Sequence, residues 1–271
     1  MDPIQEYPIR RIEAGKARSA VDKVIAEARI ELDVNDGQLR LAMLALPQDL
    51  EALAVGFLLG EGALRRVEDL EKVEAVPGEG KVLVRGDFDA DVLEAITTRW
   101  TWGVGCGRGG TSRDFDTPAY APAGPGPEMS PEGLLQLAGD FQQRAGLWKQ
   151  TGGVHACALA GKACIIHFAE DVGRHNAFDK VLGMAALNRV DVTDKLVLTT
   201  GRLSAEIVSK AVACRVPMLV SRSAVTALAV RLGRRFSLTL VGFLRGRRMN
   251  VYTGFERIVA PEESPPNGSA K

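Results

Sequence analysis

The sequence predicts an α/β protein in which a C-terminal α/β/α domain with a mainly parallel sheet follows a smaller α+β N-terminal domain. In the second half, short apolar segments typical of buried strands alternate with segments of helical periodicity, the order expected for a parallel sheet covered on both faces. The first half instead carries two hairpin signals and one apolar helix. Between them lies a run dense in proline and glycine, T-P-A-Y-A-P-A-G-P-G-P at 117–127. We therefore expect an N-terminal domain at 1–115, a linker at 116–130, the α/β domain at 131–260 and a disordered tail at 261–271.

In the first half, residues 1–20 are polar and show no usable periodicity. Alternating apolar residues on both sides of Asn35-Asp36-Gly37 predict a hairpin. Pro47 precedes a segment with apolar residues on one helical face, which predicts a core helix packed on that hairpin. A second hairpin over 73–84 and a short helix over 89–97 complete this half.

In the second half, Ser130 and Pro131 predict the start of a helix that runs to about Gln150, with Ser130 as its N-cap. A hairpin around Gly161-Lys162 and a series of alternating elements follow. We expect strands at 154–159, 163–168, 196–200, 218–221, 237–243 and 249–252, and helices at 174–188, 203–214 and 224–235.

Composition excludes several classes of function. The 271 residues include 34 basic and 34 acidic side chains, so no global charge attracts nucleic acid or an anionic membrane, and we expect neither as a partner. No apolar stretch approaches the roughly 20 residues that a membrane helix needs, and the first residues do not resemble a secretory signal. A cytoplasmic protein is expected.

Cys106 stands among glycines in the run G-V-G-C-G-R-G-G at 103–110, with Arg108 two residues further on. Such a run predicts a flexible or tightly turned loop. One interpretation is an exposed thiol that Arg108 keeps partly as the nucleophilic thiolate. The other is a glycine-rich linker that happens to carry a cysteine.

The other cysteines, Cys157, Cys164 and Cys214, lie inside apolar runs, which predicts that they are buried. No C-x-x-C spacing is present, which argues against a disulfide framework or a cysteine-built zinc site. No metal is expected.

The run E-D-V-G-R-H-N at 170–176 joins a predicted strand to a predicted helix and is rich in acid, base and amide groups. Asp171, Gly173 and Arg174 would lie at a helix N-terminus, where free backbone N–H groups favour an anion. His175 and Asp179 share a helical face. The alternative is a capped helix start with solvated charges.

His155 lies in a predicted strand, where a histidine is often a packed core residue. A zinc deaminase would need H-x-E and P-C-x-x-C, but Ala156 and Cys157 follow His155 and Cys214 stands alone.

Two successive strand-to-helix turns and one hairpin turn carry arginine and serine residues that suit phosphate groups. The alternative for the hairpin turn is a solvated basic surface. Including the two regions above, the candidate cofactor-binding residues are His155, Asp171, Gly173, Arg174, His175, Asn176, Gly201, Arg202, Ser204, Ser221, Ser223, Phe243, Leu244, Arg245, Gly246, Arg247 and Arg248.

Seven runs of the sequence, taken together, resemble the FdhD/NarQ family of formate dehydrogenase accessory sulfurtransferases. They are D-L-E-A-L-A-V-G-F-L-L-G-E-G at 49–62, C-G-R-G-G at 106–110, G-G-V-H-A at 152–156, E-D-V-G-R-H-N-A at 170–177, G-R-L-S at 201–204, S-A-V-T-A-L-A-V at 223–230 and L-V-G-F-L-R-G-R-R-M-N-V-Y-T at 240–253. They follow the family's order over most of the chain from about 40 to 258.

The resemblance implies a function. It identifies Cys106 as the residue that takes sulfur from a cysteine desulfurase as a persulfide and passes it to the molybdenum cofactor, bis(molybdopterin guanine dinucleotide), of the formate dehydrogenase catalytic subunit. It also implies a cytidine-deaminase-like C-terminal domain without metal chemistry, a homodimer, and binding of GDP-like nucleotides as cofactor analogues.

The chain departs from the family's C-G-x-C-G motif at Gly109, which stands where a second cysteine is usual. One thiol suffices to carry a persulfide, but a second could assist release. Two alternatives therefore stay open: a cofactor chaperone that moves no sulfur, and a nucleotide hydrolase that uses His175 and Asp171.

Overall fold

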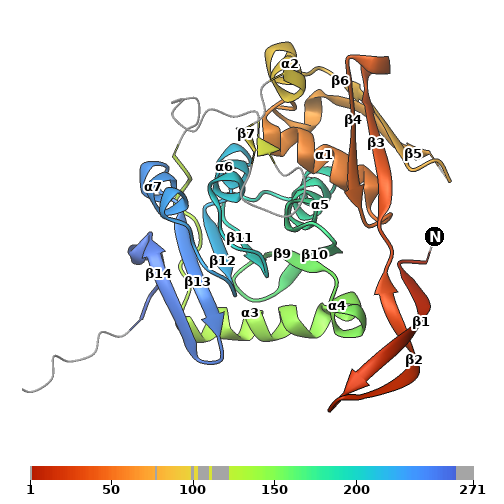
Figure 1. Cartoon of the computed structure of the whole chain (residues 1–271). Coiled ribbons are helices and arrows are strands. Elements are labelled where there is room, and N and C mark those ends of the chain that lie inside the picture. Colours follow the sequence, from red (N-terminus) through yellow and green to blue (C-terminus); the bar gives the residue numbers. More distant parts are fainter. Residues whose placement is uncertain (1, 77, 99–100, 103–109, 112–121, 261–271) are drawn as a thin grey trace, which may run out of the picture.

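The computed structural model describes residues 2–76, 78–98, 101–102, 110–111 and 122–260 (Figure 1). Cys106, Arg108 and Gly109, residues 116–121 of the predicted linker, and the predicted tail lie outside these residues. The described part contains a four-stranded sheet in the first half, a six-stranded sheet in the second, and two small two-stranded sheets. A mixed α/β architecture with a smaller N-terminal part is thus confirmed, while the domain boundaries stay a prediction.

The chain begins with a hairpin that the sequence did not predict. Strands β1 (Ile4–Glu13) and β2 (Lys16–Ile25) pair along their whole length in antiparallel register. The turn at Ala14 and Gly15 has positive φ at both residues, as a two-residue hairpin turn requires. Most side chains of this hairpin are exposed, and the hairpin projects away from the rest of the chain in Figure 1. Because it buries little, its strands lack the apolar alternation that marks other strands.

The N-terminal sheet has the strand order β4-β3-β6-β5. Its strands are β3 (Ala28–Val34), β4 (Leu39–Ala45), β5 (Leu70–Val76) and β6 (Lys81–Gly86). Both predicted hairpins are confirmed, since β3 pairs with β4 and β5 with β6 in antiparallel fashion. The predicted helices are present as α1 (Leu50–Glu61), which packs on this sheet, and α2 (Ala90–Thr98). Further along, β7 (Thr101–Trp102) pairs with β8 (Gly110–Thr111).

The six-stranded sheet has the order β10-β9-β11-β12-β13-β14. Its strands are β9 (His155–Ala160), β10 (Ile165–Asp171), β11 (Leu196–Thr199), β12 (Met218–Ser221), β13 (Thr239–Arg245) and β14 (Arg248–Thr253). Only β11 with β12 and β12 with β13 run parallel, and the other three pairings are antiparallel. The prediction of a mainly parallel sheet is therefore wrong. Hairpins form both edges of the sheet, and only its centre has the parallel, helix-connected order that the pattern indicated.

Helices cover both faces of this sheet, as predicted. α3 (Pro131–Arg144) packs on one face, and α5 (Arg174–Leu187), α6 (Ala205–Ala213) and α7 (Ala227–Arg235) pack on the other (Figure 1). Ser130 caps α3 by accepting a hydrogen bond from the backbone N–H of Gly133 at 3.0 Å, as expected. The predicted single helix to Gln150 is interrupted at Ala145, where ψ is 71°, and α4 (Gly146–Thr151) continues at a new angle.

The two halves meet where α1 crosses α5. A Cβ atom on Gly56 would overlap the carbonyl oxygen of Asp179, and one on Gly183 would overlap that of Ala52, so two glycines permit this close crossing. Within the described residues, no helix is long and apolar enough to cross a membrane.

Candidate functional site

The predicted site residues of the second half gather at one edge of the six-stranded sheet. β11, β12 and β13 end there, and so does β10 at Asp171, while β9 starts there at His155. The starts of α5, α6 and α7 follow three of these strand ends. Loops at the carboxyl ends of central parallel strands form the usual ligand-binding edge of an α/β sheet.

The turns at this edge are tied to one another by hydrogen bonds. The hydroxyl of Ser221 donates to the carbonyl of Gly201 at 2.6 Å and accepts from the backbone N–H of Ser223 at 2.9 Å. The side chain of Arg245 donates to the carbonyl of Arg222 at 2.6 Å. Ser221 is buried, so its hydroxyl fixes the loops and is not presented to a ligand. Ser223 and the exposed Arg202 remain at the rim.

At the start of α5, the side chains of Arg174 and His175 face the Glu206 carboxylate of α6. Nη2 of Arg174 and Nε2 of His175 lie 3.6 Å and 3.0 Å from Oε2 of Glu206, although the His175 nitrogen is not aligned for a hydrogen bond. The hydroxyl of Ser204 donates to the same oxygen at 3.4 Å. Burial opposes ionisation of Glu206, but its interactions with His175 and Arg174 hold its pKa below the ordinary value.

Gly201 packs directly on Arg174. A Cβ atom at Gly201 would come within 2.9 Å of the Arg174 side chain, so glycine is required to bring this turn against the helix start. Gly173 is the residue that precedes the first turn of α5. The structure therefore brings Arg174, His175, Gly201 and Ser204 together, as the sequence led us to expect.

Asp171 and Asn176 are turned toward the other half of the chain. Asp171 is fully buried, 2.7 Å from Nζ of Lys180, and accepts from the backbone N–H of Leu46 at 3.0 Å. The amide of Asn176 donates to Asp171 at 2.9 Å and to the carbonyl of Leu44 at 2.8 Å. These two side chains hold the halves together and position the loop, and Asp171 has no exposed surface for a ligand.

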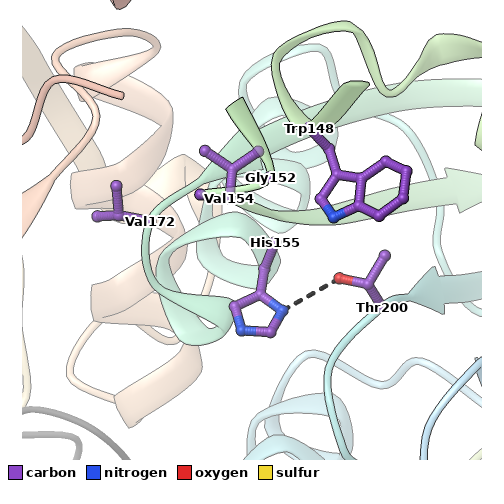
Figure 2. Close-up of a pocket in the computed structure, with 7 residues that line it drawn as sticks. Trp148, Gly152, Val154, His155, Val172 and Thr200 are labelled. Atoms are coloured by element: carbon purple, nitrogen blue, oxygen red, sulfur yellow. Dashed lines mark hydrogen bonds between the residues drawn. The ribbon is translucent and has the colours of Figure 1, made fainter. Parts of the chain in front are cut away.

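An open pocket of about 370 Å³ adjoins this edge. Figure 2 shows it between the end of α4 and the start of β9, with the indole of Trp148 and the imidazole of His155 among its walls. Nδ1 of His155 lies 3.1 Å from the Thr200 hydroxyl. Burial, together with the charges of Arg174 and His175, lowers the pKa of His155. The full lining is Trp148, Gly152, Gly153, Val154, His155, Val172 and Thr200.

Trp148 is the pocket residue that sequence reasoning missed. It lies in the extra helix α4, whose N-terminus is bound by Glu170: the carboxylate accepts from the backbone N–H groups of Leu147 and Trp148 at 2.9 and 2.8 Å. The sequence signal was Gly152, four residues after Trp148, because glycine often ends a helix; Gly152 does so here with a φ of 65°.

The predicted arginine turn is present between β13 and β14. Arg245, Gly246, Arg247 and Arg248 are exposed, and Gly246 has a φ of 58°. Leu244 points into the core under α3, so it offers no side-chain surface to a ligand. Phe243, with a φ of 53°, lies at an irregularity in the pairing with β14.

The prediction that three cysteines are buried is correct only for Cys157. Cys157 is fully buried and burial raises the pKa of its thiol, which makes it a poor nucleophile. Cys214 is partly buried and Cys164 is exposed. The apolar run that contains Cys164 crosses the turn between β9 and β10, and a turn lies at the surface whatever the hydropathy of its neighbours. Cys106, the predicted catalytic residue, lies outside the described residues.

The described residues contain no group of three or more histidine, cysteine or acidic side chains placed to hold a metal ion. The groups at this edge include arginines, hydroxyls and the neutral imidazole of His155, beside the Glu206 carboxylate that faces Arg174 and His175. The arginines and hydroxyls suit a ligand with anionic and hydrogen-bonding groups.

Comparison with known proteins agrees with this architecture. A protein from Listeria monocytogenes serotype 4b named sulfur carrier protein FdhD is 35% identical over 266 aligned residues, which cover 95% of this chain and 100% of that relative. The Bacillus subtilis protein of the same name is 32% identical over 252 residues, covering 92% and 95% of the two chains.

A solved structure is also similar. The crystal structure of a protein from Desulfotalea psychrophila, described as a candidate formate dehydrogenase accessory protein, superposes with a TM-score of 0.77 at 26% identity and covers 94% of this chain and 99% of that one. The model of the FdhD/NarQ family matches residues 25–259. The chain therefore belongs to the FdhD/NarQ family.

Proposed function

We propose that the protein is a sulfur carrier that supplies sulfur to the molybdenum cofactor of a formate dehydrogenase. The observation that carries this proposal is the alignment with the Listeria relative, whose name is sulfur carrier protein and which is matched over its full length. The Desulfotalea neighbour, described by its connection to formate dehydrogenase, supports the identity of the enzyme served.

Cys106 is the proposed sulfur-carrying residue. Its thiolate attacks the outer sulfur of a persulfide on a cysteine desulfurase, the donor's S–S bond breaks, and the donor cysteine leaves as a thiolate. Cys106 then holds the sulfur as its own persulfide. In the second step an electron pair of the acceptor forms the new bond to the outer sulfur, the S–S bond breaks and Cys106 leaves as a thiolate. Because the acceptor supplies both electrons, this route does not require a second cysteine at position 109.

The environments of the other cysteines support the choice of Cys106. Cys157 is buried and has a raised thiol pKa. Cys164 is exposed, but it lies in the turn between β9 and β10. Asp171 and His155 lie at the opposite end of these two strands. A strand of six residues spans roughly 20 Å, so Cys164 is too far from the loop edge for direct transfer.

The loop edge is the proposed binding surface for the bis(molybdopterin guanine dinucleotide) substrate. Arg174, Arg202 and the exposed arginine turn at 245–248 suit its phosphate groups, and a GDP-like nucleotide should occupy part of the same surface. Within the same proposal, the C-terminal half has a cytidine-deaminase-like architecture, the protein acts as a cytoplasmic homodimer, and its partners are a cysteine desulfurase and the formate dehydrogenase catalytic subunit.

Mass spectrometry of the intact protein after incubation with a desulfurase and cysteine tests the carrier step. We expect one added sulfur, about 32 Da, on the wild type and on the control variant Cys164→Ala, and none on Cys106→Ala. Cys164 is a matched control because it is the exposed cysteine of the described residues. An adduct that persists on Cys106→Ala would overturn the assignment.

Gly109 favours one alternative, a cofactor chaperone that moves no sulfur. Complementation separates the two functions: in a strain that lacks the protein, a sulfur carrier requires Cys106, whereas a chaperone with Cys106→Ala restores formate dehydrogenase activity as well as the wild type does. Binding of the nucleotide part is tested by whether GDP raises the thermal midpoint.

A further inference from the structure

The pocket beside the loop edge contains a histidine whose hydrogen-bonding state is set by a neighbouring threonine. Nδ1 of His155 lies 3.1 Å from Oγ1 of Thr200, and the same oxygen accepts a hydrogen bond from the backbone N–H of Ala156 at 3.0 Å (Figure 2). Within the described residues, the hydrogen bond of this imidazole is made at Nδ1 and not at the other ring nitrogen, Nε2. It lies on the side of the ring away from Thr200 in Figure 2.

The single proton of the Thr200 hydroxyl decides the tautomer. It can point to Nδ1 at 3.1 Å or to the carbonyl oxygen of Ala156 at 3.4 Å. The contact with the carbonyl is long for an O–H···O hydrogen bond, and that carbonyl already accepts from the backbone N–H of Thr200 at 3.0 Å, so donation to Nδ1 is favoured. If the hydroxyl donates to Nδ1, the neutral ring must carry its own proton on Nε2.

Burial and neighbouring charges keep this ring neutral. Burial lowers the pKa of His155 most, and Arg174 and His175 of α5 add to the effect by acting against a positive charge on the ring. The carboxylates of the adjacent strand do not compensate, because Asp171 is paired with Lys180 and Glu170 accepts from the backbone of α4. A ligand therefore meets an N–H donor without a charge.

We propose that Thr200 holds His155 as the neutral Nε2–H tautomer, so that the pocket offers an uncharged hydrogen-bond donor to an acceptor atom of the cofactor substrate during sulfur delivery. This inference rests on the proposed function for its role in delivery, but the tautomer itself does not. His155 is thus a substrate-positioning residue, and Thr200 acts through it.

Nuclear magnetic resonance tests the tautomer on the whole wild-type protein. The chain has three histidines, His155, His167 and His175, so two-bond ¹H–¹⁵N correlations of the imidazoles can be assigned by the signal lost in His155→Gln. At pH 7 we expect the pattern of a ring protonated on Nε2 alone. A pattern for Nδ1–H or for a doubly protonated ring would overturn the proposal.

Two variants test the role of the donor. Glutamine places its amide N–H₂ near the position of Nε2, whereas asparagine places it near Nδ1. We expect His155→Gln to restore formate dehydrogenase activity in the complemented strain to within about threefold of the wild type, and His155→Asn to lower it at least about tenfold, the loss expected for one substrate hydrogen bond.

Both variants should still gain one sulfur on Cys106 from the desulfurase, because the pocket acts in delivery and not in loading. Equal activity of the two variants, or loss of the adduct in His155→Asn, would overturn the donor role. If the wild type itself gains no sulfur, the proposed function fails while the tautomer result stands, so the two failures are distinguishable.

Discussion

At the scale of single residues, Asp171 of the E-D-V-G-R-H-N run and its partner Lys180 have a structural role. Asp171 and Lys180 are both fully buried, and Lys180 also donates to the carbonyl of Leu46 at 3.0 Å. Removing one member of such a pair leaves the other charge without compensation in the interior.

Lys180→Met should therefore lower the free energy of unfolding by about 3–5 kcal/mol, measured by urea denaturation. Lys72→Met is the matched control, because Lys72 pairs with Glu74 on the surface and both side chains are more than half exposed; it should change stability little. The double variant Asp171→Asn with Lys180→Met should recover part of the loss. Equal effects of Lys180→Met and Lys72→Met would contradict the structural role of the buried pair.

Glu206 predicts a dependence of stability on pH. The pKa of Glu206 is lower in the folded chain than in the unfolded one. The contribution of its carboxylate to the free energy of unfolding is therefore complete above the unfolded pKa of roughly 4.3. That contribution is lost as the pH falls through the pKa of the folded state. The difference in urea midpoint between the wild type and Glu206→Gln should therefore shrink as the pH is lowered from 7 to 3. A difference that stays constant over this range would show that the pairing with Arg174 and His175 does not stabilise the carboxylate.

At the scale of elements, the crossing of α1 and α5 depends on two glycines. Gly56→Ala or Gly183→Ala would place a methyl group on a backbone carbonyl of the opposite helix, and neither helix can yield without losing its other contacts. We expect each to cost at least about 2 kcal/mol in urea denaturation.

Gly139 provides the control for these variants. It lies within α3 and a Cβ atom there would meet nothing within 4 Å, so Gly139→Ala should raise stability by about 0.5–1 kcal/mol through helix propensity alone. A loss at Gly139 as large as that at Gly56 would show that the close crossing of α1 and α5 is not the cause of these losses.

The β1–β2 hairpin is the element that should be dispensable for folding. Among the described core clusters, none includes a residue from 4 to 24, and the family model also begins only at residue 25. A chain that starts at Ile25 should keep its circular dichroism spectrum and lose less than about 1 kcal/mol of stability, because an isolated two-stranded hairpin contributes little. Loss of cooperative unfolding in the shortened chain would contradict this.

The contrast between this hairpin and the other strands shows what a sequence can reveal. β11 and β12 are buried on both faces, so their apolar residues mark them, whereas β1 and β2 bury almost nothing and leave no such pattern. Strand direction is a different matter. The run at 154–159 predicts a strand equally well whether it pairs parallel or antiparallel with β11, and the antiparallel pairing is seen only in the folded sheet.

The same limit applies to the site. The convergence of the turns after β11 and β12 could be predicted from the alternation of strands and helices, because parallel neighbours end at the same edge. The burial of Asp171 could not, because its partners at Leu46 lie 125 residues earlier in the chain and the contact depends on how the two halves pack. The pocket wall formed by Trp148 depends likewise on the break at Ala145.

At the scale of the whole molecule, the two sheets are joined through buried polar groups as well as apolar contacts. Asp171 and Lys180 bond to the backbone of Leu46, and Lys210 of α6 lies 3.5 Å from Glu61 of α1 while it also pairs with Asp179. Burial raises the pKa of Asp179, and Lys210 opposes that rise. Separating the halves would break these bonds and expose the apolar surface of α1 and α5.

The halves should consequently unfold together, although the sequence predicts two domains. Calorimetry should give one transition in which the calorimetric and van't Hoff enthalpies agree. Residues 122–260 expressed alone should be poorly folded, since α5 would expose the surface that α1 covers, and co-expression with residues 2–121 should restore the native spectrum. Two separate transitions, or a stable isolated C-terminal half, would show that the interface is a contact between independent domains. In that event the loop around Asp171 would keep its place without Leu46, and Lys180→Met would cost far less than predicted above.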